Sequence, residues 1–173
     1  GLEAAKVAAM RGHDVVLLEK GGKLGGQMVT ASVPRYKEGL LDFVDYLENR
    51  VKKLGVKIAL GKEATPESVR AYNPEAVVVA TGVKRRALDL PGPKSIPVLA
   101  AEDILEGKAE VGETVIVVGG SMVGCEVAEF LAEKGKKVTI VETLDTPAAD
   151  MEPAHRRHLL NRLKKWGVTF MLK

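Results

Sequence analysis

Residues 1–19 read GLEAAKVAAMRGHDVVLLE, and residues 124–142 read GCEVAEFLAEKGKKVTIVE. The two stretches align without a gap, and each runs from a glycine through a helical pattern and a second glycine to an apolar run that ends in glutamate. Seven positions are identical: Gly1/Gly124, Glu3/Glu126, Ala5/Ala128, Ala9/Ala132, Gly12/Gly135, Val15/Val138 and Glu19/Glu142. This order is typical of the second half of a dinucleotide-binding fold, in which an acidic residue about 20 positions after the glycines holds a ribose. The sequence therefore predicts two nucleotide-binding units, and two dinucleotides indicate electron transfer between them.

The repeat continues beyond the two glutamates, but with a different spacing. Residues 49–56, NRVKKLGV, recur as residues 161–168, NRLKKWGV. The first repeat is offset by 123 positions and this one by 112, so the first copy carries 11 extra residues. They lie within residues 21–39, GGKLGGQMVTASVPRYKEG. A glycine-rich loop after a strand is where open α/β sheets place ligands, so we interpret this insertion as an enlarged binding loop.

Composition and charge describe a globular chain and exclude several classes of function. The 173 residues correspond to one or two domains, and a hydrophobic content of 46% is ordinary for such domains. The net charge is only +3 and basic residues alternate with acidic ones, so no nucleic-acid partner is expected. No apolar run approaches the roughly 20 residues that span a bilayer, and no signal peptide is expected. The single cysteine excludes an internal disulfide and fits a reducing compartment, so we expect a cytoplasmic protein without membrane partners.

Apolar periodicity predicts alternating helices and strands. Helices are predicted over residues 1–11, 37–54, 66–72, 101–106, 122–134 and 153–166. Strands are predicted over residues 15–19, 56–60, 76–80, 114–118, 137–142 and 168–172. The strands are continuously apolar rather than alternating, which favours parallel sheets covered on both faces. The fold class is therefore α/β, with two incomplete Rossmann-like three-layer units.

The second unit holds the stronger nucleotide-binding motif. Residues 114–124 read TVIVVGGSMVG, the order strand, glycine turn and helix. Gly119 permits the tight turn and Gly124 lets helix and strand pack closely, whereas Ser121 stands where the motif has its middle glycine. The Ser121 hydroxyl could donate to a phosphate oxygen, beside the free amides of the helix N-terminus. Glu142 suits a ribose diol and would repel a 2′-phosphate, so NADH is favoured over NADPH. A Rossmann-like unit with a vestigial site is the alternative.

Several stretches carry a closer resemblance to a known family. They are residues 21–27 (GGKLGGQ), 77–82 (VVVATG), 90–92 (LPG), 100–108 (AAEDILEGK) and 117–142 (VVGGSMVGCEVAEFLAEKGKKVTIVE). The chain resembles the pyridine nucleotide–disulfide oxidoreductase superfamily, with its paired FAD and NAD domains. More narrowly, it is similar to the C-terminal part of Old Yellow Enzyme-like NADH:flavin oxidoreductases, a group that includes 2,4-dienoyl-CoA reductase, 2-enoate reductase and trimethylamine dehydrogenase relatives.

The resemblance implies a domain division and a set of cofactor-binding residues. Residues 1–84 correspond to a partial FAD-binding domain that lacks its first strand, residues 85–112 to a linker, and residues 113–173 to a partial NAD-binding domain. On the FAD side the matching residues are Gly1, Glu19, Lys20, Gly25, Gly26, Gln27, Ala80, Thr81 and Gly82. On the NAD side they are Gly119, Gly120, Ser121, Met122, Val123, Gly124 and Glu142. A structural interpretation stays open for each, because a glycine pair also makes turns and Thr81-Gly82 also ends a strand.

Other reactive residues carry no chemistry in this interpretation. Cys125 follows a glycine at the start of a helix, and we interpret it as a small packed residue. The sequence contains no C-x-x-C pair, so a dithiol relay within these residues is excluded. His155 and His158 lie three positions apart without partner cysteines, so no metal site is expected. No catalytic residue is assigned, because in hydride transfer the cofactors carry the chemistry and the protein positions them.

The resemblance implies an FAD- and NADH-binding module that passes hydride from NADH to flavin. In the family, an N-terminal barrel with FMN and a 4Fe–4S cluster receives the electrons for reduction of an enoyl or dienoyl substrate, and this barrel is absent here. The alternatives are a ferredoxin-reductase-like or NADH-oxidase flavoprotein, and a non-catalytic nucleotide-binding fragment. The match begins at the third glycine of the FAD motif, so the sequence is expected to be a fragment. Its exposed sheet edges predict marginal stability or self-association.

Overall fold

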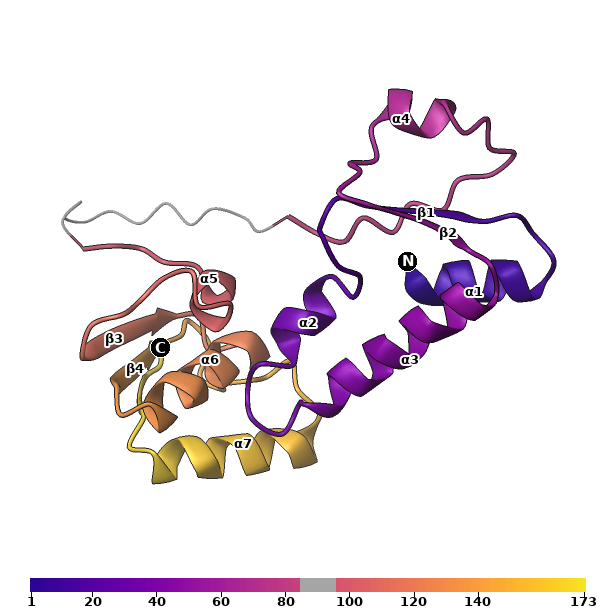
Figure 1. The fold of residues 1–173 in the computed structure, drawn as a ribbon. Helices are drawn as coiled ribbons and strands as arrows, with labels where there is room; N and C mark the ends of the chain where they lie inside the picture. The colour runs from indigo at the N-terminus through magenta and orange to yellow at the C-terminus, as the bar shows by residue number, and fades with distance from the viewer. Residues whose placement is uncertain (85–95) are drawn as a thin grey trace. The chain divides into compact units, whose positions relative to one another are not determined.

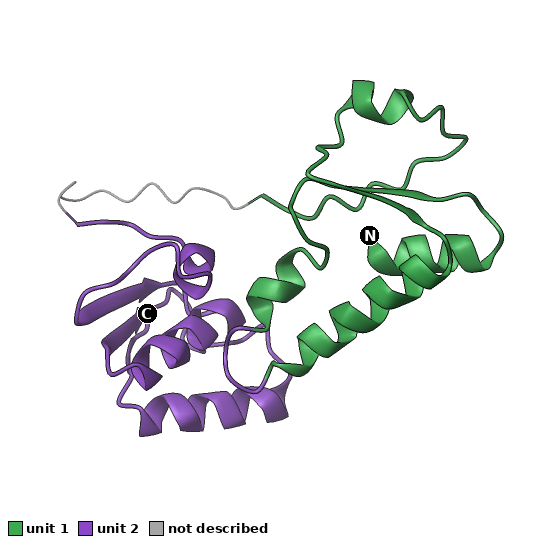
Figure 2. Cartoon of the chain, viewed as in Figure 1, with its two compact units in different colours: residues 1–32, 37–91 green, residues 33–36, 92–173 purple. Residues whose placement is uncertain are grey.

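The computed structural model describes residues 1–84 and 96–173, which form two compact units. Unit 1 comprises Gly1–Ser32 and Lys37–Pro91, and unit 2 comprises Val33–Tyr36 and Gly92–Lys173 (Figure 2). The LPG motif and the first part of the predicted linker, residues 85–95, lie outside the described residues. The domain boundaries drawn from the sequence therefore stay a prediction.

Unit 1 is built around two parallel strands and two longer helices. Its elements are α1 (Leu2–Met10), β1 (Val16–Glu19), α2 (Gln27–Ala31), α3 (Gly39–Lys53), β2 (Lys57–Leu60) and α4 (Pro66–Arg70) (Figure 1). Strand β1 pairs with β2 from Val16↔Lys57 to Glu19↔Leu60. The amphipathic helix α3 buries Val44, Leu47 and Val51. Val51 packs with Ala5 of α1 and Val56, so this small core joins both helices to the strand pair.

Two details of unit 1 differ from the sequence prediction. Residues 21–36 were expected to be loop, but they contain the short helix α2. The apolar stretch Ala76–Ala80 was expected to be a strand, and that prediction is wrong: no strand is formed there, and Val79 is 80% exposed. A strand exists only where its backbone N–H and C=O groups bond to a neighbour. Apolar composition predicted the extended segment, but β1 and β2 pair only with each other among the described residues.

Unit 2 contains a three-stranded parallel sheet with helices packed on it. Its elements are α5 (Ala101–Leu105), β3 (Thr114–Val118), α6 (Met122–Glu133), β4 (Lys137–Val141), α7 (Pro153–Lys165) and β5 (Thr169–Met171) (Figure 1). The strand order is β3-β4-β5, with β3 paired to β4 from Thr114↔Lys137 to Val118↔Val141. The buried core is apolar, with contributions from α6, β4 and α7. The predicted α/β class with parallel sheets is confirmed in both units.

The core of unit 2 extends into the segment that had been predicted as linker. Buried core residues include Cys125, Ile140, Leu159 and Leu163. Helix α5 packs Ala101, Ile104 and Leu105 against this cluster. Its observed bounds agree closely with the predicted helix over residues 101–106. The described part of the predicted linker is therefore structured as part of unit 2.

The short segment Val33–Tyr36 also belongs to unit 2. Arg35 forms an ion pair with Glu133 of α6, with a distance of 3.2 Å between Nη1 and Oε1. The centre of the Tyr36 ring lies 5.1 Å from the Arg35 guanidinium carbon and 4.8 Å from that of Arg162. Arg162 of α7 in turn binds Glu129 of α6 through two hydrogen bonds. A network of charges and one aromatic ring thus fixes this segment against α6 and α7.

Candidate functional site

The glycine turn after β3 has the geometry that a phosphate-binding loop requires. Gly119 adopts φ 102°, a conformation that favours glycine, and its N–H donates to the Val141 carbonyl at 2.9 Å. A Cβ added to Gly124 would lie 1.9 Å from the Gly119 carbonyl oxygen, so only glycine fits at this position. The turn therefore brings the start of α6 directly against the end of β3, as the spacing of the two glycines predicted.

At the N-terminus of α6, the side chain that binds a backbone amide is Asp150 and not the N-cap residue Ser121. Ser121 is the N-cap of α6 and is exposed, but its side chain makes no capping hydrogen bond. The Met122 N–H instead donates to Oδ1 of Asp150 at 2.8 Å. Asp150 was not among the residues singled out from the sequence. Asp150 lies 28 positions after Met122 in an irregular loop, where no periodicity or motif indicates it.

Glu142 directly follows β4 and reaches the glycine turn. Its Oε2 accepts from the Gly120 N–H at 2.6 Å, and its Oε1 accepts from the Leu144 N–H at 2.9 Å and the Thr143 hydroxyl at 3.1 Å. These donors lower the pKa of the Glu142 carboxyl below its usual range, with the Leu144 amide as the largest cause and Gly120 next. The side chain is therefore an ionised acceptor beside the turn, the charge state that a ribose-binding carboxylate needs.

The predicted FAD-side residues of unit 1 form a second, looser group. Glu19 ends β1, and its Oε1 accepts from the Gly21 N–H at 2.7 Å, which parallels the Glu142–Leu144 contact two residues further on. Gly25 adopts φ 106°, and a Cβ there would lie 2.8 Å from side-chain atoms of Val29 and Val44. The loop between β1 and α3 therefore folds tightly onto α3 at Gly25. Of the remaining loop residues, Lys20, Gly26 and Gln27 are exposed.

Of the predicted turn Ala80-Thr81-Gly82, only Ala80 lies near another predicted FAD-side residue, Gly1. The Cβ of Ala80 and a side-chain carbon of Leu17 each lie 3.9 Å from the point where a Cβ on Gly1 would be. Ala80 is thus close to the N-terminus of α1, next to β1. Thr81 and Gly82 are exposed and follow no strand. Unit 1 therefore brings together Gly1 and Ala80, and it holds Glu19 in a local turn of its own.

Cys125 has the properties of a packed residue. It is fully buried in the core of unit 2, and its thiol lies 3.5 Å from the Gly120 carbonyl oxygen. Burial, followed by the negative charge of Asp150, raises the pKa of the Cys125 thiol to about 11. The thiolate needed for nucleophilic or redox chemistry is therefore disfavoured. Within residues 1–84 and 96–173, no cluster of His, Cys, Asp and Glu side chains has the arrangement of a metal site.

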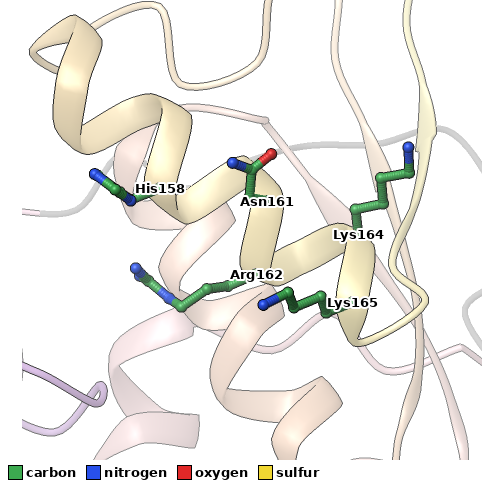
Figure 3. Close-up of a pocket in the computed structure, with 5 residues that line it drawn as sticks. All are labelled: His158, Asn161, Arg162, Lys164 and Lys165. Atoms are coloured by element: carbon green, nitrogen blue, oxygen red, sulfur yellow. The ribbon is translucent and has the colours of Figure 1, made fainter.

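A basic depression on α7 lies apart from the predicted binding residues. It is lined by His158, Asn161, Arg162, Lys164 and Lys165, all on α7. Figure 3 shows His158, Arg162 and Lys165 extending from one side of the helix and Lys164 from the other. Because Arg162 is committed to Glu129, the depression presents flexible surface charges rather than a convergent set of donors. In the described part of the chain, no helix combines the length and apolarity needed to cross a bilayer.

Comparison with known proteins identifies the family. All 173 residues match the family described as pyridine nucleotide-disulphide oxidoreductase. The chain is 45% identical over 142 residues to the cinnamate reductase of Clostridium sporogenes, covering 82% of this chain and 21% of that protein. It is 41% identical to the NADH oxidase of Thermoanaerobacter brockii, covering 98% of this chain and 27% of that protein. A solved structure of 2-naphthoyl-CoA reductase superposes with a TM-score of 0.92 at 32% identity, covering 99% of this chain and 26% of that one.

The fold and the glycine turn thus define a dinucleotide-binding part of an oxidoreductase with FAD and NADH as cofactors. The chain belongs to the pyridine nucleotide–disulphide oxidoreductase family. The resemblance to Old Yellow Enzyme-like flavoproteins is also confirmed, because its relatives include such reductases. The chain spans about a quarter of the length of the reductase and oxidase relatives named above.

Proposed function

We propose that unit 2 binds NADH at the glycine turn and that unit 1 holds FAD, so that hydride passes from the nicotinamide to the flavin. The observation that supports this most directly is the Glu142 carboxylate, placed 2.6 Å from the Gly120 amide at the mouth of the turn. In an open parallel sheet, ligands bind at the carboxyl ends of the strands, and Glu142 follows β4 at that end. When bound, NADH supplies the hydride and the flavin accepts two electrons.

On the NADH side, each residue has a defined task in this proposal. Gly119 makes the tight turn, and Gly124 lets α6 pack against it, since any side chain at Gly124 would overlap the Gly119 carbonyl. The backbone of residues 120–123 offers amide donors, and α6 adds the positive end of its dipole. The Glu142 carboxylate accepts from the ribose hydroxyls and repels a 2′-phosphate. These tasks favour NADH over NADPH.

On the FAD side, the proposed contacts follow the same plan with an enlarged loop. Gly1 is the N-cap of α1, where a phosphate would meet free backbone amides. Glu19 stands at the end of β1 as the ribose-binding carboxylate, with Lys20 after it. The loop with Gly25, Gly26 and Gln27, and the turn of Ala80, Thr81 and Gly82, contact the flavin nucleotide. The tight fold at Gly25 supports a fixed loop rather than a flexible insertion.

In the intact protein, we propose that the electrons reduce an enoyl or dienoyl substrate. Similarity to a cinnamate reductase and to a 2-naphthoyl-CoA reductase supports this class of acceptor. A plain NADH-oxidase flavoprotein is the second candidate, because a relative with 41% identity carries that name. A reductase and an NADH oxidase differ in the electron acceptor. Measuring NADH oxidation by the intact protein with cinnamate in the absence of oxygen therefore distinguishes between these two functions. Turnover without oxygen supports the reductase, and turnover only with oxygen supports the oxidase.

The NADH site is tested by Glu142→Ala in the intact protein, with bleaching of the flavin absorbance as the readout. Loss of a charged acceptor should weaken NADH by roughly 10- to 100-fold, the range for hydrogen bonds to charged groups. NADPH should be affected less, because the repelling carboxylate has also gone, so the preference for NADH narrows. Asp145→Ala is the matched control, since it removes an equal charge from the same loop without a contact to the turn. Unchanged discrimination in Glu142→Ala would remove the role given to this carboxylate.

A further inference from the structure

The loop between β4 and α7 folds back over the glycine turn of unit 2. The Ala148 N–H donates to the Gly120 carbonyl at 2.6 Å, and Ala148 itself is fully buried. Ala148 also adopts φ 51°, a left-handed conformation that costs energy for a residue with a Cβ. The surrounding contacts thus hold the loop at this point. Two residues later the chain emerges again, and Asp150 is exposed at the N-terminus of α6.

Two amides of the glycine turn are occupied by carboxylates of the protein itself. Glu142 accepts from the Gly120 N–H at 2.6 Å, and Asp150 accepts from the Met122 N–H at 2.8 Å. Met122 is the first residue of α6, a helix of 12 residues, so its amide lies at the positive end of the helix dipole. This is one of the donors that a bound pyrophosphate would require. One N–H cannot serve both anions at full strength, and two negative groups that close repel each other.

We propose that Asp150 determines the affinity of the NADH site by occupying the Met122 amide until the pyrophosphate displaces it. This inference rests on the NADH site proposed above and specifies how that site is regulated. Binding then becomes an exchange of one anion for another. Because Asp150 is exposed, its side chain can turn into solvent while buried Ala148 keeps the loop attached.

The exchange affects every phosphate ligand that uses the Met122 amide. A free phosphate or pyrophosphate gains only the amides, and it must displace Asp150 with no further contact. A dinucleotide gains the Glu142 contact to its ribose as well, so it binds more tightly, but it displaces the same carboxylate. Asp150 therefore lowers the affinity for each of these ligands by the same factor.

The test uses the intact protein and ADP-ribose, which has the pyrophosphate and the adenosine ribose but no nicotinamide to reduce the flavin. Calorimetry would compare the wild type with Asp150→Ala and Asp150→Asn. We expect Asp150→Ala to bind roughly tenfold more tightly, the size of one charged contact at a helix N-terminus. Asp150→Asn keeps an acceptor oxygen without the charge, so its affinity should lie between the two. Equal or weaker binding by Asp150→Ala would overturn the proposal.

Two controls separate exchange from a change in net charge or in loop structure. Asp145→Asn removes the same charge from the same loop, and its Oδ1 contacts only Thr146 nearby, so its affinity should stay within about twofold. The dissociation constant of inorganic pyrophosphate, measured by its competition with ADP-ribose, should fall in Asp150→Ala by about the same factor as that of ADP-ribose. A variant that had merely loosened the loop would show no such gain, and this result would also overturn the proposal.

Failure of the inference and failure of the NADH site give different results. In Glu142→Ala, binding of ADP-ribose should be lost or greatly weakened if unit 2 is the site. If Glu142→Ala binds weakly but Asp150→Ala binds no better than the wild type, only the role of Asp150 is wrong. If neither substitution changes the affinity for ADP-ribose, the NADH site itself is wrong, and the role of Asp150 is overturned with it.

Discussion

The two units share a repeated sequence but differ in the number of paired strands and in the size of the buried core. Unit 2 pairs three parallel strands and buries a continuous apolar cluster that draws on α6, α7 and β4. Unit 1 pairs two strands, and its corresponding cluster consists of Ala5, Val51 and Val56 with partly buried neighbours. The repeat therefore sets the local order of helix, turn and strand in both units. The size of the core depends on how many strands find a partner.

The same contrast holds at the two proposed binding sites. In unit 2, Glu142 reaches the glycine turn itself, and Gly124 packs against the carbonyl of Gly119. In unit 1, Glu19 accepts from the Gly21 amide in a local turn, and Gly25 packs against the side chains of Val29 and Val44. The closest glycine contacts therefore lie in different places in the two units. In unit 2 the glycine packs against backbone after β3, and in unit 1 it packs against side chains in the loop after β1.

The sharpest way to break this comparison is to substitute one glycine in each unit. Gly124→Ala places a Cβ 1.9 Å from a backbone oxygen, so β3 and α6 must separate, and the free energy of unfolding of unit 2 should fall by about 3 kcal/mol. Gly22→Ala in unit 1 meets no atom within 4 Å and should change stability by less than about 0.5 kcal/mol. Urea denaturation measures both effects, with Trp166 fluorescence reporting unit 2, where the one tryptophan of the sequence lies, and circular dichroism reporting both units. Equal effects at the two glycines would contradict this difference in packing.

Residue spacing predicted the elements of unit 2 well because the decisive interactions are local. The positive φ of Gly119 and the close approach at Gly124 are required by a strand that turns directly into a helix. Glycine-to-glutamate spacing also placed Glu142 at the end of β4, where it meets the turn. Local backbone geometry fixes Gly119 and Gly124, and the pairing of β3 with β4 places Glu142 beside them.

Other features depend on contacts that the local sequence does not encode. Asp150 reaches Met122 across 28 positions from an irregular loop, so neither spacing nor periodicity could have found it. The segment Val33–Tyr36 was read as part of a loop, yet an ion pair and an aromatic ring bind it to unit 2. Ala76–Ala80 has the composition of a buried strand, but a strand also needs a neighbour, and its composition alone cannot supply one.

A second comparison concerns two ion pairs, one from each unit, that join distant parts of the chain and differ in burial. Glu129 and Arg162 of unit 2 form a bidentate pair with side-chain exposures of 4% and 32%. Lys57 and Asp14 of unit 1 are 3.1 Å apart, but their side chains are 67% and 78% exposed. Glu129→Gln should cost about 2 kcal/mol, because it leaves a partly buried guanidinium without its counter-charge. Asp14→Asn should cost less than about 0.5 kcal/mol, as is usual for exposed pairs.

Chemical denaturation of Glu129→Gln and of Asp14→Asn measures the loss of stability in each. The double variant Glu129→Gln/Arg162→Met then tests why Glu129→Gln is destabilising. If the cost arises from the unpaired charge, the double variant should recover part of the stability lost in Glu129→Gln. Tyr36 packs on Arg162, so the loss of the guanidinium should also release the Val33–Tyr36 segment to hydrogen exchange. A loss in Asp14→Asn as large as that in Glu129→Gln would show that burial does not distinguish the two units.

A further effect is confined to unit 2 and depends on pH. Cys125 is buried and has its pKa raised from 9.0 to about 11, whereas the equivalent position of unit 1 is Leu2, which does not titrate. Because the folded pKa lies above the unfolded one, the neutral thiol's contribution is fully present below pH 9.0 and is lost as pH rises toward 11. At pH 10 the loss should be about 1 kcal/mol. Urea denaturation of the wild type and Cys125→Ala at pH 8 and pH 10 isolates the contribution of the thiol, since other titrating groups are common to both.

Native Cys125 should also resist iodoacetamide at pH 8 and react once unit 2 is unfolded in urea. An equal loss of stability in Cys125→Ala, or rapid alkylation of the folded protein, would mean that the thiol is not held neutral in the core.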